Sequence, residues 1–264
     1  MLREIKILHK NKAAEFIVDR HYSPVMPSLT RYYCGYFIDD ELQGVITFGY
    51  GVRPQHTIKK LFPTLEAKDY LEIGKMCMDD SMGKNSETQM LSSALRWLKN
   101  NKPDLKYLFT WADGLVGKAG YVYQAFNFLY GGYIWTETYV TKKGEKVHPR
   151  TIQSQLPNTK NYKYGSRPNP KQLKELELSR VKGKQFRYIL PMNKKMRKYL
   201  KNSTEKWTIN YPKDKDLEWK IKKPGETTYK KTNIMPFNLT KEVEYNQNNI
   251  NKFKLKNNLD EFFA

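Results

Sequence analysis

The stretch from Tyr107 to Gly132 constrains the fold more than any other part of the chain. It begins with an apolar run, Tyr107–Trp111, that is typical of a buried strand, and it continues through Ala112-Asp113-Gly114 into a loop spaced by glycines. The apolar segment Tyr121–Tyr130 follows and predicts a helix, which Gly131-Gly132 would end. A strand, a glycine loop and a helix are the parts of an α/β active site, in which ligands lie at the carboxyl ends of strands.

Hydrophobic periodicity predicts further elements on both sides of this stretch. The predicted helices are Lys10–Arg20 and the segment after Ser86, and the predicted strands are Arg31–Ile38, Leu42–Tyr50, Tyr70–Met78, Tyr133–Thr141 and Phe186–Leu190. Because a helix joins Tyr70–Met78 to Tyr107–Trp111, these two strands should be parallel with a right-handed crossover. The order of elements predicts an α/β fold of the α+β type, with a mixed central sheet and flanking helices.

Three short motifs in the same stretch resemble the core pattern of the Mom family of phage DNA-modification proteins. They stand here as Trp111-Ala112-Asp113, Val122-Tyr123-Gln124-Ala125 and Tyr130-Gly131. The resemblance implies a GNAT-like acyltransferase fold, in which an acyl donor lies between the two middle strands where they splay. It also implies modification of the exocyclic amine of adenine in DNA, which would protect phage DNA from host restriction.

Three residues are candidates for the chemistry. An aspartate that ends a buried apolar strand is costly unless it is paired or used, so Asp113 is a candidate base or orienter of the amine. The alternative is a cap for the turn at Gly114. By the resemblance, Tyr123 would protonate the departing group of the donor, since a phenol keeps its proton at neutral pH; it could instead be a core aromatic. Tyr22 resembles an early Tyr-Ser element of the family and could line the acceptor pocket or simply end a helix.

A loop at Ser81–Thr88 is the candidate donor site, because free amides at a helix N-terminus bind phosphate. The Gln/Arg-x-x-Gly-x-Gly/Ala pattern that GNAT proteins usually carry there is absent, and Asn85, Ser86 and Thr88 are available instead. A capping box from Ser86 to Gln89 would also explain Ser86. Lys75 stands where the family usually has Arg, and it would hold an anionic donor only as a point charge.

The residues do not identify the donor. A coenzyme A thioester such as acetyl-CoA is the expectation from the fold, while an aminoacyl-tRNA would suit the net charge of +20. The four histidines have no metal-binding spacing, so no metal site is expected. Cys34 and Cys77 are expected to be buried free thiols, which indicates a cytoplasmic protein.

Positive charge is concentrated in one segment. Residues 1–140 have a net charge of +2, residues 141–202 of +15 and residues 203–264 of +3. A concentrated block is expected of a protein that binds a polyanion, here double-stranded DNA, although a solvated basic face is the alternative. The candidate DNA contacts are Arg150, Arg167, Lys184, Arg187 and Tyr188. The cations would hold phosphates and the aromatic would stack on a base taken out of the duplex.

Residues 1–200 are expected to form the GNAT-like catalytic domain, and residues 203–264 a Lys- and Asn-rich extension. No apolar run reaches the roughly 18 residues of a transmembrane helix, and the start is too charged for a signal peptide, so a location in the host bacterial cytoplasm is expected. Near the end, Leu259, Phe262 and Phe263 resemble a sliding-clamp docking peptide. Alternatively, they fold back on their own domain.

Together these features predict a phage-type DNA modification enzyme that transfers an acyl-derived group to the exocyclic amine of adenine. One alternative is a GNAT-type N-acyltransferase for a protein or small molecule, which would bind a coenzyme without needing the basic segment. Another is a noncatalytic DNA-binding protein, whose DNA binding would be unchanged by Asp113→Ala.

Overall fold

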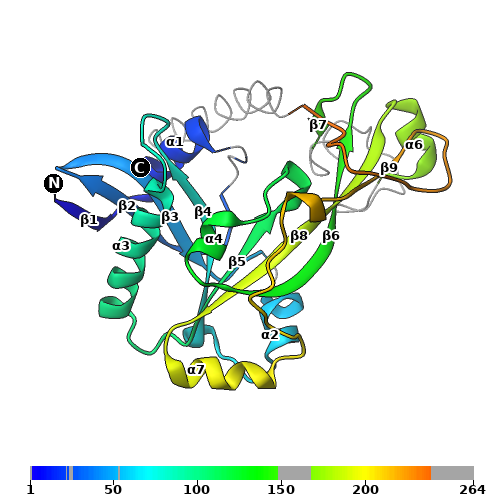
Figure 1. Cartoon of the computed structure of the whole chain (residues 1–264). Helices are drawn as coiled ribbons and strands as arrows, with labels where there is room; N and C mark the ends of the chain where they lie inside the picture. The colour runs from blue at the N-terminus through cyan, green and yellow to red at the C-terminus, as the bar shows by residue number, and fades with distance from the viewer. Residues whose placement is uncertain (1, 22, 24–25, 53, 148–167, 239–264) are drawn as a thin grey trace, which may run out of the picture. The chain divides into compact units, whose positions relative to one another are not determined.

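The computed structural model describes residues 2–21, 23, 26–52, 54–147 and 168–238 (Figure 1). The chain forms two compact units. Unit 1 consists of Met1–Ala112, Gly120–Gly132 and Arg187–Tyr211. Unit 2 consists of Asp113–Ala119, Tyr133–Phe186 and Pro212–Ala264. Two long strands, β6 (Leu129–Val140) and β8 (Ser179–Pro191), contribute residues to both units.

Five strands of the sheet lie in unit 1, and β8 follows them in strand order beside β5. The five are β1 (Arg3–Ile7), β2 (Thr30–Ile38), β3 (Glu41–Gly49), β4 (Tyr70–Met78) and β5 (Tyr107–Asp113). β1 to β4 are successive antiparallel neighbours, whereas β4 and β5 are parallel. Asp39 and Asp40 make the tight turn between β2 and β3 with φ values of 47° and 67°, a left-handed conformation that Asp tolerates.

Two helices cover opposite faces of this sheet, α1 (Lys10–Arg20) and α3 (Ser86–Asn101). Val45 and Cys77, which are partners in β3 and β4, pack in one core cluster with Ala13 and Ile17 of α1. The neighbouring position in β3, Gly44, faces the other way: a Cβ there would lie 2.8 Å from the sulfur of Met90 in α3. Since side chains alternate along a strand, the sheet is buried on both faces.

Three shorter helices complete unit 1: α2 (Ile58–Leu61), α4 (Tyr121–Ala125) and α7 (Lys194–Tyr199). A second core cluster joins Ile58 and Leu61 of α2 to Tyr107 and Phe109 of β5 and to Leu200. The mixed sheet, its flanking helices, and the parallel pair β4 and β5 joined by α3 confirm the predicted fold class. The first strand, β1, was not predicted.

The helix predicted over Tyr121–Tyr130 is wrong in its second half. α4 ends at Ala125, Asn127 takes a left-handed φ of 58°, and the chain enters β6 at Leu129. Gly131 does not end a helix but lies within β6, where a Cβ would come 2.1 Å from the Trp207 ring. An apolar run of this length fits either a helix or a strand, and the contact with Trp207 is a tertiary effect.

Unit 2 contains the remaining strands, β7 (Lys146–Val147), β9 (Trp219–Lys222) and β10 (Lys230–Thr232), and the helix α6 (Pro170–Glu175). β8, β9 and β10 are antiparallel neighbours, and so are β6 and β7. Its core cluster consists of Tyr139, Val147, Leu173 and Leu178. β9 and β10 come from the segment that the sequence suggested was an extension. In the part of the chain that the structure describes, no helix combines the length and apolar character needed to cross a membrane.

Candidate active site

The parallel strands β4 and β5 pair only at their beginnings. Their register contains Tyr70 with Tyr107, Leu71 with Leu108 and Glu72 with Phe109. Both strands continue beyond these pairs, β4 to Met78 and β5 to Asp113. The carboxyl-terminal halves of the two strands are therefore not bonded to each other in this register, at the position where α/β sheets bind ligands.

Glu72 is a buried carboxylate at the point where this pairing ends. Its side chain accepts a hydrogen bond from Trp111 of β5, and the residue is 9% exposed. The backbone of Gly51 packs closely against it, since a Cβ at Gly51 would lie 2.4 Å from Oε2 of Glu72. Burial raises the pKa of Glu72 to about 7, although the Trp111 hydrogen bond opposes the shift. Glu72 can therefore gain or lose a proton near neutral pH.

The sequence interpretation missed Glu72 as a site residue. The available signal was a charged residue directly between Leu71 and Ile73 in a largely apolar strand. A charged group in a strand that is buried on both faces must be paired or must lose its charge, and this is a reason to suspect function.

Tyr123 on α4 has both a packing role and a hydroxyl directed toward polar groups. Its ring lies 5.5 Å from that of Phe128 and 5.7 Å from that of Tyr188, centroid to centroid. Burial raises its pKa, the neighbouring Thr110 hydroxyl lowers it, and the charge of Glu72 raises it again. The Tyr123 hydroxyl thus keeps its proton at neutral pH, beside Thr110 and within the electrostatic influence of Glu72.

Lys75, in the second half of β4, is buried and held by protein groups. Its Nζ donates to the backbone oxygen of Ser23 at 2.7 Å and to the Ser23 hydroxyl at 2.9 Å. Its backbone N–H donates to Thr47 Oγ1 at 2.9 Å. The predicted contact of Lys75 with an anionic donor stays a prediction. Tyr22, the neighbour of Ser23, lies outside the described residues.

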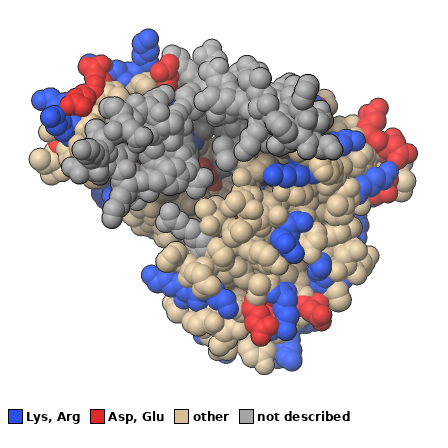
Figure 2. All heavy atoms as spheres, turned by 180° about the vertical axis from the view of Figure 1, so that it is seen from behind, with Lys and Arg blue, Asp and Glu red and all other residues tan. Residues whose placement is uncertain are grey.

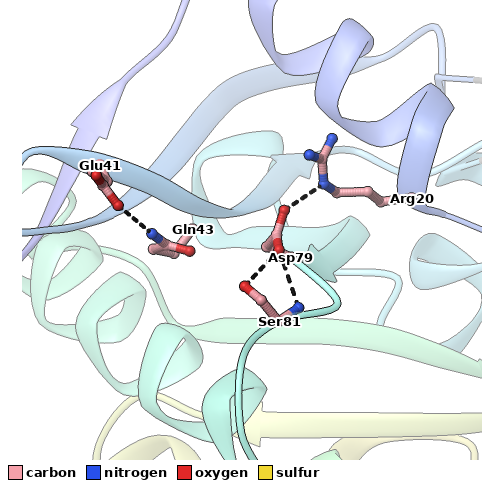
Figure 3. A network of polar contacts seen from close by, with 5 residues as sticks. All are labelled: Arg20, Glu41, Gln43, Asp79 and Ser81. Carbon is pink, nitrogen blue, oxygen red and sulfur yellow. Dashed lines mark hydrogen bonds and ion pairs between the residues drawn. The ribbon is translucent and has the colours of Figure 1, made fainter.

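The loop between β4 and α3 is anchored by Asp79 (Figure 3). Oδ1 of Asp79 accepts hydrogen bonds from the Ser81 hydroxyl at 2.7 Å and from the Ser81 N–H at 3.1 Å, and Oδ2 accepts one from Arg20 Nε at 2.9 Å. These bonds lower the pKa of Asp79 to about 2. Beside them, Gln43 Nε2 donates to Glu41 Oε2 at 3.2 Å (Figure 3). The Asp79 carboxylate therefore stays charged at neutral pH and fixes the loop to α1.

The helix that follows this loop begins differently from the prediction. α3 starts at Ser86, and its N-cap is Asn85, which has a φ of 70° and makes no side-chain capping bond. The predicted capping box is wrong, because Ser86 already lies inside the first helical turn and is buried. Asn85 is exposed and Thr88 is half-buried. The predicted donor contacts of these three residues stay predictions.

Asp113 ends β5 and belongs to unit 2. Its Oδ1 accepts a hydrogen bond from Leu115 N–H at 3.2 Å and so caps the short helical turn Gly114–Val116. A Cβ at Gly114 would lie 2.6 Å from the backbone oxygen of Lys184, so glycine allows this turn to pack on β8. The capping alternative is present in the structure, and the catalytic role of Asp113 stays a prediction.

Two of the predicted DNA contacts are buried in unit 1. Arg187 donates from Nη1 to the backbone oxygen of Gly131 at 3.0 Å and lies 3.2 Å from Glu205 Oε1. Tyr188 is fully buried and accepts a hydrogen bond from Gln124 Nε2 at 3.0 Å. Neither side chain reaches the surface on which a DNA strand would lie. Their contact with DNA stays a prediction that this burial does not favour.

The other predicted DNA contacts are in unit 2 or outside the described residues. Lys184 donates to the backbone oxygen of Asp216 at 2.9 Å and lies 3.5 Å from Glu218 Oε2, so its charge already has a partner. Arg150 and Arg167 lie outside the described residues. The residues that resemble a clamp-docking peptide, Leu259, Phe262 and Phe263, also lie outside them. On the face drawn in Figure 2, Lys and Arg side chains lie at several separate places, some of them beside Asp and Glu.

The two cysteines are buried free thiols, as predicted. Burial raises the pKa of Cys34 and of Cys77 to about 12. Among the residues that the structure describes, no group of three or more His, Cys, Asp or Glu side chains is placed to hold a metal ion.

Comparison with known proteins gives a consistent set of relatives. Residues 3–213 match the Mom protein family. The chain is 30% identical over 203 residues to methylcarbamoylase mom of Escherichia phage Mu, an alignment that covers 76% of this chain and 80% of the relative.

Solved structures with a similar fold include an N-acetyltransferase from Staphylococcus aureus Mu50, with 14% identity and a TM-score of 0.37, which covers 73% of this chain and 100% of that chain. Another is an acetyltransferase of the GNAT family from Streptococcus pneumoniae, with 10% identity, a TM-score of 0.38 and the same coverage. Likenesses of this degree carry no information about ligands or chemistry.

Proposed function

Because the chain belongs to the Mom protein family of phage DNA-modification proteins, we propose that it transfers an acyl-derived group to the exocyclic amine of adenine in DNA. The name of the phage Mu relative suggests that this group is a methylcarbamoyl group. The reaction would take place in the cytoplasm of the infected host. The observation that carries the proposal is the buried carboxylate of Glu72 where the pairing of β4 and β5 ends, whose charge acts on the pKa of the Tyr123 hydroxyl.

The exocyclic amine of adenine is a weak nucleophile, because its lone pair is delocalised into the ring. In the proposed step, a bond forms between this nitrogen and the carbon of the transferred group, and the bond between that carbon and the donor breaks. Glu72 takes the proton from the amine, and Tyr123 gives its proton to the departing group. A pKa of about 7 suits Glu72 to this exchange, since a general base works best near the operating pH.

A thioester of coenzyme A is the proposed donor, and it would supply the activated carbon. The start of α3 fits a phosphate-containing donor, since the Asn85 side chain makes no capping bond there. The Ser86 N–H already donates to the Gly83 oxygen at 3.3 Å, so the amides after it in the first turn are the proposed donors to phosphate oxygens. Lys75, Ser86 and Thr88 remain the other proposed contacts. An aminoacyl-tRNA donor has no support among the relatives and is not proposed.

Mass spectrometry of nucleosides from plasmid DNA tests the function. In cells that express the wild-type protein, we expect a heavier deoxyadenosine that cells with the empty vector lack. Its added mass identifies the transferred group. Unmodified deoxyadenosine in cells that contain the folded protein would contradict the proposal.

Asp113→Asn separates the two roles of Asp113. The amide oxygen of Asn can still accept the hydrogen bond from Leu115, so the turn is kept while the negative charge is lost. If the charge orients the amine, the yield of modified nucleoside should fall about tenfold or more. Asp113→Ala, which also loses the cap, is the comparison. An Asn variant as active as wild type beside an impaired Ala variant would leave Asp113 with the capping role alone.

A further inference from the structure

Three lysines form a row across neighbouring strands of unit 2. Lys182 of β8 is the register partner of Lys220 of β9, and Lys220 is the partner of Lys231 of β10. Register partners have their side chains on the same face of a sheet, so three ammonium groups lie side by side. Like charges directly opposite each other destabilise a sheet. The row therefore opposes folding unless something negative compensates for it.

Aromatic side chains join this row to form a pocket of about 320 Å³. It is lined by Trp135 of β6, by Tyr229 and by the three lysines of the row. Nζ of Lys220 lies 4.0 Å from the centroid of the Trp135 ring, and Nζ of Lys182 lies 4.6 Å from that of Tyr229. Cations and aromatic rings thus alternate around one opening.

Among the described residues, most of the lysines at the pocket have no carboxylate within ion-pair distance. Lys231 lies 3.4 Å from Glu218 Oε1. Among the residues that the structure describes, no carboxylate lies within ion-pair distance of Lys182, Lys220 or Lys222, the last of which is 5.5 Å from the Tyr229 ring. The pocket is therefore electropositive and suited to an anion.

Glu137 is a second described carboxylate near the pocket, and it does not remove this charge. It accepts a hydrogen bond from the Tyr229 hydroxyl at 3.3 Å, and its Oε1 lies 3.9 Å from Arg180 Nε. Its negative charge thus has a cation of its own. The bond to Tyr229 fixes the position of one aromatic wall.

We propose that this basic aromatic pocket binds one strand of the DNA substrate, with phosphates on Lys182, Lys220 and Lys222 and a base stacked on Trp135. The choice of DNA as the polyanion rests on the proposed function. Stacking on aromatic rings beside a cationic track is how proteins hold single strands. Lys182 and Lys220 are partners on neighbouring strands about 5 Å apart, and Lys222 lies two residues, about 7 Å, further along β9, so the three lysines lie within reach of a short run of phosphates. The pocket would serve as a docking site for DNA in unit 2, made by residues other than those proposed for the chemistry.

Fluorescence anisotropy with labelled single-stranded and duplex oligonucleotides at several salt concentrations tests the lysines. The variant is the triple exchange Lys182→Gln, Lys220→Gln and Lys222→Gln. Its matched control is Lys10→Gln, Lys12→Gln and Lys99→Gln, which removes the same charge from exposed positions of α1 and α3. The pocket variant should bind about tenfold or more weakly, and the slope of log affinity against log salt should be shallower by about 2 to 3. The control should stay close to wild type. Equal affinities and slopes for the two triple variants would overturn the inference.

Trp135→Leu tests the stacking. It should weaken binding of the single strand by about 5- to 100-fold and leave the salt slope unchanged, because stacking releases no counterions. Unchanged single-strand affinity in a folded Trp135→Leu variant would overturn the proposed stacking.

The docking inference and the proposed function can fail separately. If DNA binding depends on the three lysines but wild-type cells contain no modified deoxyadenosine, the docking inference stands and the proposed function fails. If modified deoxyadenosine forms and the pocket triple variant binds DNA as the wild type does, the function stands and the docking inference fails.

Discussion

Replacing Glu72 with Gln is expected to reduce DNA modification by about 100-fold or more, the usual cost of losing a positioned general base. Gln has nearly the same shape and can still accept the hydrogen bond from Trp111, so the site should keep its geometry. What it lacks is a group that takes a proton near neutral pH. The measurement is the initial rate of modified deoxyadenosine formation by purified protein, and a rate equal to that of wild type would exclude Glu72 as the base.

The same exchange should make the protein more stable at alkaline pH. The pKa of Glu72 is raised from 4.5 to about 7 in the folded protein, so folding favours the protonated carboxyl. The contribution of protonated Glu72 to the free energy of unfolding is fully present below about pH 4.5 and is lost as the pH rises through 7. At about 1.4 kcal/mol for each pKa unit, the full effect is of the order of 3 kcal/mol.

Urea denaturation between pH 5 and pH 8 measures this effect. The free energy of unfolding of wild type should fall across this range by a component that Glu72→Gln lacks. Glu15→Gln is the control, because Glu15 is exposed on α1 and its replacement removes the same charge. If the free energies of unfolding of wild type and Glu72→Gln change in parallel with pH, the buried carboxylate does not titrate in this range.

Tyr123→Phe should lower the modification rate by about 100-fold, because it removes only the proton that the hydroxyl would give to the departing group. The ring contacts with Phe128 and Tyr188 remain, so the free energy of unfolding should change by only about 1 kcal/mol, the usual net worth of one hydrogen bond.

Tyr121→Phe provides the matched control for this exchange. It makes the same chemical change two residues earlier on α4, at a side chain that is 48% exposed. We expect it to retain nearly the wild-type rate. If Tyr123→Phe and Tyr121→Phe are equally active, the role of Tyr123 is limited to packing in the core.

Local sequence patterns predicted the central sheet well. Helical periodicity placed α1 at Lys10–Arg20, and the apolar run Tyr70–Met78 is β4 with the predicted bounds. The pattern failed at Tyr121–Tyr130, where apolar residues alone could not tell α4 from the start of β6. There the outcome depends on the left-handed Asn127 and on the packing of Trp207 against Gly131, and neither is visible in local periodicity.

The candidate site was predictable only in part. Motifs pointed to Tyr123, and the structure places its hydroxyl beside Thr110. Glu72 belongs to no motif, and its raised pKa arises from burial by residues distant in the sequence. Tyr188 shows the opposite failure: cations surround it in the sequence, but β8 directs its side chain into the core. Which face of a strand is buried depends on the neighbouring strands, which a single sequence does not reveal.

The burial of Cys34 and Cys77 gives unit 1 a chemical reporter of its own opening. With pKa values of about 12, both thiols are almost wholly protonated at neutral pH and shielded from alkylating reagents. Cys34 in β2 and Cys77 in β4 lie on either side of β3, so both become reactive when the sheet separates. The rate at which a maleimide labels the native protein therefore follows the opening of this sheet. It does so at concentrations of denaturant far below those that unfold the protein.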